Sequence, residues 1–70
     1  MAKYALGDNQ GALDDYSKGI EINPQYAVAF YNRGNAKYAL GDKEGACSDW
    51  RKAGELGVQE AYEMIKKYCK

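Results

Sequence analysis

Small and apolar residues return at every third or fourth position along four stretches of this chain. That spacing is typical of one face of an α-helix. Residues favoured in strands are few, and none alternates with polar residues over the length of a strand. The pattern therefore predicts an all-α fold with helices over residues 10–22, 25–40, 43–56 and 58–70.

Short breaks separate these stretches, and each has residues that end or begin helices. The pairs Gly7-Asp8 and Gly41-Asp42 combine a residue that can close one helix with a residue that can cap the next. Asn23-Pro24 is a second kind of break, since proline cannot continue a helix but fits the first turn of a new one. Leu56-Gly57 is the third. The chain should therefore turn sharply at each of these points.

The heptapeptide AKYALGD occurs twice, at residues 2–8 and again at 36–42. Thirteen of the 24 residues from 2 to 25 are identical to those 34 positions later. Two helices joined by a tight Gly-Asp turn form an antiparallel hairpin, and hairpins repeated at a fixed period stack into a solenoid. Gly34, Ala46 and Ala53 each lie near a large ring in the sequence, Phe30 or Trp50, and a small residue beside a large ring should let two helices approach closely.

A 34-residue helix-turn-helix period with these residues resembles the tetratricopeptide repeat. The resemblance implies a right-handed solenoid of helical hairpins, with a partial repeat at 1–26, a complete repeat at 27–60 and a C-terminal capping helix at 61–70. The sequence also looks like bacterial members of that family, and Sel1-like repeats are a close relative in pattern. Arg33 and Lys37 stand where the family has Leu and an aromatic, so packing of that helix should be thinner. The positions that match the family pattern are Phe30, Gly34, Leu40, Gly41, Asp42, Ala46, Trp50 and Ala53.

Charge and composition argue against several function classes. Ten basic and ten acidic residues give no net charge, which disfavours nucleic-acid binding, including by an RNA-reading helical repeat. The chain has no histidine, the commonest general base and metal ligand. We therefore expect no enzyme activity, no metal and no cofactor. The acidic residues, expected to form a solvated helix face, are Asp14, Asp15, Glu21, Asp42, Glu44, Asp49 and Glu55.

The two cysteines, Cys47 and Cys69, are too few for a disulfide framework, so a reduced intracellular pair is the default expectation. Cys47 should be a small buried apolar residue, and Cys69 should be exposed near the chain end. No apolar run approaches the ~18 residues of a spanning helix, so we expect no membrane contact. These features favour the cytoplasm. The pattern starts in the middle of a repeat, which leaves export through an upstream leader open.

The resemblance implies a function in protein–protein interaction, with a peptide held in a concave groove lined by the first helix of each hairpin. The residues matching that groove are Val28, Tyr31, Asn32, Asn35 and Tyr38. Tyrosine supplies rigid contact area and asparagine can bond a peptide backbone. The alternative is that the tyrosines pack on a neighbouring helix and the asparagines are surface filler. Binding of a chaperone tail is not expected, because Tyr31 and Tyr62 stand where such family members have lysines.

A second hypothesis is self-association, with a dimer favoured. Only the last turn of the first helix is expected, at Ala2–Leu6, so the helix at 10–22 has apolar residues with one neighbour to cover them. Such a surface favours contact with a second copy, by stacking or by exchange of helices at the Gly41-Asp42 turn. Its residues are Leu13, Tyr16 and Ile20.

Overall fold

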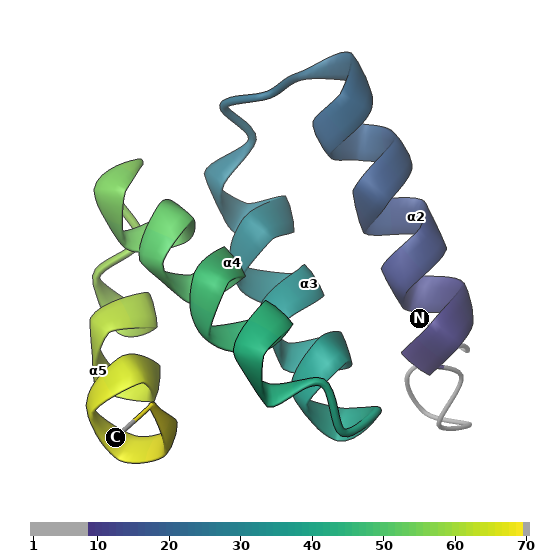
Figure 1. The fold of residues 1–70 in the computed structure, drawn as a ribbon. Coiled ribbons are helices and arrows are strands. Elements are labelled where there is room, and N and C mark those ends of the chain that lie inside the picture. Colours follow the sequence, from purple (N-terminus) through teal and green to yellow (C-terminus); the bar gives the residue numbers. More distant parts are fainter. Residues whose placement is uncertain (1–8, 70) are drawn as a thin grey trace.

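The computed structural model describes residues 9–69, and this part of the chain contains four helices and no strand (Figure 1). They are α2 (Asn9–Ile22), α3 (Ala27–Ala39), α4 (Lys43–Glu55) and α5 (Gln59–Tyr68). The all-α prediction is confirmed, and the bounds lie within two residues of those expected. The first copy of the heptapeptide, with its predicted helix end and Gly7-Asp8 turn, lies outside the described residues.

Glycine and aspartate form the turn between α3 and α4 as the sequence predicts. Gly41 has a φ of 92° and Gly57, after α4, has a φ of 116°, a region that side chains with a Cβ rarely adopt. The Asp42 carboxylate accepts a hydrogen bond of 2.9 Å from the backbone N–H of Gly45. This bond satisfies one of the donors left without a partner at the start of α4.

The connection between α2 and α3 differs from the prediction. The sequence placed Pro24 in the first turn of the next helix, but α3 begins only at Ala27. Asn23 instead organises a separate turn, in which its side-chain oxygen accepts from the N–H of Gln25 at 3.1 Å. Asparagine favours such turns because its side chain competes for backbone donors. The consequence is a longer loop between α2 and α3 than the Gly-Asp turn between α3 and α4.

The helices form one row of neighbours in space. α3 packs against α2 on one side and α4 on the other, and α4 packs against α5. In Figure 1, α4 lies in front of α3, and α2 and α5 lie on opposite sides of that pair. The two central helices are therefore the best covered, and the outer two have a face that no described helix covers.

The centre of the core is the indole of Trp50 on α4, which is fully buried. A Cβ added to Gly34 on α3 would lie 2.6 Å from the Trp50 Nε1 atom, so the ring lies directly on the α3 backbone. This contact confirms that a small residue on one helix makes room for a large ring on the other. Ala46, Ala53 and Ala61 are also fully buried around it.

Candidate partner-binding face

The five α3 residues that the sequence assigned to a groove lie on one side of that helix, and none of them is buried. Val28, at the start of α3, is 55% exposed. Tyr31, Asn32, Asn35 and Tyr38 are partly exposed. Residues buried on other sides of the same helix include Phe30 and Gly34. Tyr31 and Tyr38 also pack against the core, so the stripe is partly accessible, and its two tyrosines are shared between the surface and the packing of the helices.

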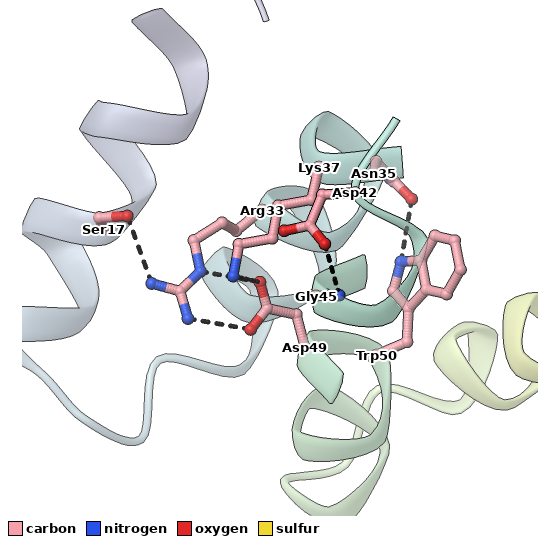
Figure 2. A network of polar contacts seen from close by, with 8 residues as sticks. All are labelled: Ser17, Arg33, Asn35, Lys37, Asp42, Gly45, Asp49 and Trp50. Atoms are coloured by element: carbon pink, nitrogen blue, oxygen red, sulfur yellow. Dashed lines mark hydrogen bonds and ion pairs between the residues drawn. The ribbon is translucent and has the colours of Figure 1, made fainter. Parts of the chain in front are cut away.

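Asn35 has a structural contact that the sequence did not predict. Its side-chain oxygen accepts a hydrogen bond of 3.1 Å from Nε1 of Trp50 (Figure 2). An indole N–H can only donate, so the amide oxygen of Asn35 faces the core and its NH₂ group is the part left to donate to a ligand. The same residue thus satisfies the one polar atom of the buried indole and belongs to the accessible stripe.

Three aromatic rings from three helices meet at the C-terminal end of α3. The ring of Tyr38 lies 5.8 Å from that of Trp50 and 4.7 Å from that of Tyr68 on α5, measured between centroids. The Lys43 ammonium lies 5.9 Å from the centre of the Tyr38 ring, within the range of a cation–π contact. Tyr38 is therefore held in place by packing, and Tyr68 and Lys43 are neighbours that the sequence analysis did not assign to this face.

On the side of α3 toward α2, a carboxylate is buried among cations (Figure 2). Asp49 of α4 is only 4% exposed, and its two oxygens accept from Nε and Nη2 of Arg33 at 2.8 and 2.9 Å. The Lys37 ammonium lies 3.3 Å from the same carboxylate. The third nitrogen of the Arg33 guanidinium donates to the Ser17 hydroxyl of α2 at 3.3 Å. The expectation that Asp49 belongs to a solvated face is wrong.

This network also corrects the expectation of thin packing at Arg33 and Lys37. The guanidinium fills the space between α2, α3 and α4 and satisfies both oxygens of the buried Asp49 in a two-point contact. The hydrogen bond to Asp49 raises the pKa of Arg33. Burial of the guanidinium acts in the opposite direction, and the negative charge of Asp49 adds to the increase. The two charged residues therefore orient α3 relative to both neighbours, which fixes where the accessible stripe points.

The three residues proposed for self-association lie on α2 and are all partly exposed. Ile20 packs against the core formed by α3 and α4. Burial, with a smaller contribution from nearby Tyr26, raises the pKa of Tyr16. Ala12 is the only buried residue of α2, whereas α4 has five. Both α2 and α4 follow a Gly-Asp sequence, and α2 is the less buried of the two. It contains Leu13, Tyr16 and Ile20.

The cysteine prediction is wrong: Cys47 and Cys69 form a disulfide within the chain. Their Cα atoms lie 6.0 Å apart, because α5 runs back along α4 and brings the chain end beside the second turn of α4. The sequence did not predict this contact between two residues 22 positions apart, because the contact depends on the direction in which α5 packs on α4. The bond fixes the C-terminal end of α5 to α4.

Residues 2–41 match the family model described as the TPR repeat, which covers 40 of the 70 residues. No curated protein and no solved structure matches the chain. Within residues 9–69, no group of three His, Cys, Asp or Glu residues is placed to hold a metal ion. None of the four described helices has the length and apolar character needed to cross a membrane.

Proposed function

Since the chain belongs to the tetratricopeptide repeat family, whose repeats mediate contacts between proteins, we propose that α3 supplies its partner-binding face. The proposed face consists of Val28, Tyr31, Asn32, Asn35 and Tyr38. One observation supports it above the others. The stripe is partly exposed on a helix that is held in place away from it by the Arg33–Asp49 network and by the packing of Trp50 on Gly34. A rigid, accessible surface loses little conformational entropy when it binds.

The chemistry of the stripe fits an extended peptide. Val28 and Tyr31 offer apolar area to a side chain of the partner, and the tyrosine ring adds contact at low entropic cost. Asn32 can both donate to and accept from a peptide backbone, whereas the oxygen of Asn35 already accepts from Trp50, so the NH₂ group of Asn35 is the part best placed to bind a ligand. We therefore expect a partner that presents a backbone carbonyl to Asn35 and an apolar side chain toward Val28.

A display selection against the folded chain tests this proposal. Random peptides would be selected on the immobilised wild-type protein, and the binders re-tested on Val28→Asp and Asn32→Ala. We expect affinity to fall about tenfold for each, because an apolar contact or a backbone hydrogen bond contributes about 1–2 kcal/mol. Lys52→Ala, an exposed change on α4, is the control and should bind normally. Binders unaffected by the α3 changes would contradict the proposal.

Self-association is the second candidate, and the exposure of α2 favours it. Leu13, Tyr16 and Ile20 are partly exposed, and Ile22 at the end of the same helix is 81% exposed. A second copy placed about a two-fold axis would cover both α2 faces at once. Such a dimer is compatible with binding at α3, because the two surfaces lie on different helices.

Light scattering on a sizing column tests this second candidate. A dimer would give twice the 7.8 kDa of the single chain, and Leu13→Asp should return it to the monomer mass. Asn32→Ala is the control, since the α3 stripe does not take part. A wild-type mass of 7.8 kDa at high concentration would contradict self-association.

The disulfide changes the compartment that we propose. The cytoplasm was favoured on the expectation of reduced cysteines, but disulfides form and persist in oxidising compartments. We infer that the chain works where its disulfide can form. Alkylation of free thiols at the moment of cell lysis, followed by mass measurement, would detect unmodified cysteines in that case. Two alkylated cysteines would instead support the cytoplasm.

A further inference from the structure

The disulfide lies in the wall of an open cavity of about 480 Å³ between α4 and the end of α5. Both cysteines are partly exposed and line this cavity. Lys43 and Arg51 line the same cavity, four residues before and four residues after Cys47 on one face of α4. Glu44 is the one acidic residue of the lining, so the cavity keeps a net positive charge. Tyr68 completes the wall.

We propose that the Cys47–Cys69 disulfide is an exchange site for anionic low-molecular-weight thiols, and that its reduction releases the end of α5. The reagent class is a thiol that also has a carboxylate or sulfonate group, of which glutathione is an example. The two cations attract such an anion and orient it beside the sulfur atoms. They also favour one direction of cleavage, because a thiolate on Cys47 would form between two positive charges.

The exchange takes place in two steps that balance. The external thiolate attacks the Cys69 sulfur, a new sulfur–sulfur bond forms there, and Cys47 leaves as a thiolate with the electron pair of the broken bond. A second external thiolate then attacks the reagent sulfur of this mixed disulfide. Cys69 leaves as a thiolate, and the two reagent molecules depart as their own disulfide. The cysteines gain two electrons, and two reagent thiols supply them.

Few contacts other than the disulfide hold the C-terminal end of α5. α5 has ten residues, fewer than an isolated helix needs to be stable in water. Its first half is anchored by buried Ala61 and by the Tyr62 ring, which lies against Gly54 of α4. Its last turn is held by the disulfide, by Ile65, which packs against the core, and by the Tyr68 ring, whose centre lies 4.7 Å from that of Tyr38 and 5.9 Å from that of Trp50. Reduction should therefore free the last turn first and change the surroundings of Trp50.

The test compares two reagents on three forms of the full chain. The reduction rate would be measured at low ionic strength with 2-mercaptoethanesulfonate, whose reacting thiolate also carries a sulfonate charge, and with 2-mercaptoethanol, whose reacting thiolate carries no second charge. The variants are Lys43→Gln/Arg51→Gln and a control, Lys18→Gln/Lys52→Gln, which removes the same charge outside the cavity. We expect the rate with 2-mercaptoethanesulfonate, divided by the rate with 2-mercaptoethanol, to fall about three- to tenfold in the cavity variant alone. Equal ratios in all three forms would overturn the exchange site.

Two further readouts keep the proposal open to refutation if the cavity variant folds poorly. Raising the salt from about 0.01 M to about 0.5 M should slow the wild-type reaction with 2-mercaptoethanesulfonate more than the reaction with 2-mercaptoethanol, because the two attacking thiolates carry two negative charges and one. On reduction, the backbone N–H of Cys69, which donates to the Ile65 carbonyl at 2.8 Å, should lose more hydrogen-exchange protection than the amides of α3, whose protection falls only with the stability of the whole chain. An equal salt effect on both reagents, or full protection of the α5 end after reduction, would contradict the corresponding half of the proposal.

Discussion

Replacing Gly34 by alanine should destabilise the chain, although alanine is the better helix former. The change gains about 1 kcal/mol of helix propensity in the middle of α3. The new Cβ would lie 2.6 and 2.7 Å from two atoms of the Trp50 ring and 3.1 Å from the Ala46 carbonyl oxygen. Ordinary contacts between such atoms are about 3.5–4.0 Å, so a fully buried ring would have to move by about 1 Å.

The cost of that movement outweighs the gain. Overpacking of a core typically costs about 1–3 kcal/mol, and displacement of the indole weakens its hydrogen bond to Asn35, for about another 1 kcal/mol. The net effect of Gly34→Ala is a loss of about 1–3 kcal/mol in the free energy of unfolding. In a domain of this size, that corresponds to a fall in Tm of roughly 5–20 °C.

The assay is urea unfolding followed by fluorescence of Trp50, the chain's single tryptophan. Gly19→Ala is the matched control, because Gly19 is also inside a helix but its added Cβ would lie 3.4 Å from the Tyr26 ring, at the edge of ordinary contact. We expect the control to be neutral or slightly stabilising. If Gly34→Ala were as stable as Gly19→Ala, the close packing of Trp50 on α3 would be refuted.

Three further predictions concern the remaining contacts that hold the helices together. Asp49→Ala should lower the free energy of unfolding by about 2–4 kcal/mol, measured by urea unfolding, which is below the maximum for a buried pair because Arg33 can still reach solvent. The control is Glu21→Ala, an exposed change that should cost less than about 0.5 kcal/mol. Equal losses in the two variants would contradict a buried ion pair. Asp42→Ala should lower the free energy of unfolding by about 1 kcal/mol, since it removes the cap of α4. Asp42→Asn should recover most of that loss in the same assay. An unchanged unfolding midpoint for Asp42→Ala would argue against the cap. Reduction of the disulfide should lower stability by about 3 kcal/mol, from the entropy of closing a loop of 22 residues, and an unfolding curve that does not respond to reductant would show that the bond contributes nothing.

Much of the fold could be predicted from the sequence because local chemistry determines it. The 34-residue repeat and the three-and-four spacing predicted the helices, and Gly41 with Asp42 predicted the turn that joins α3 to α4. Close packing of small residues against large rings was also predictable, but the particular pairing of Gly34 with Trp50 was not, since the two residues are 16 positions apart. These features depend on residues close in sequence or related by the period.

The features that were missed depend on how helices cross in space. Arg33 and Asp49 are 16 residues apart and meet only because α3 and α4 are antiparallel at that level. The sequence suggested exposed charges, since Asp49 resembles the other acids of the chain. Cys69 reaches Cys47 only because α5 returns along α4. For the α3 face, the sequence pointed to a stripe that is partly exposed in the structure. It did not predict that Asn35 also forms a hydrogen bond to the buried indole.

The central claim is that the α3 face contacts a partner protein, and site-specific photo-crosslinking in cells tests it most directly. A photoreactive amino acid would replace Asn32 on α3 or, as the control, Lys52 on α4. We predict a covalent adduct with another protein at position 32 that is absent at position 52. An adduct that contains only two copies of this chain would contradict the claim, because the α3 face would then contact a second copy and not another protein. Equal adducts at both positions, or none at position 32, would contradict the claim.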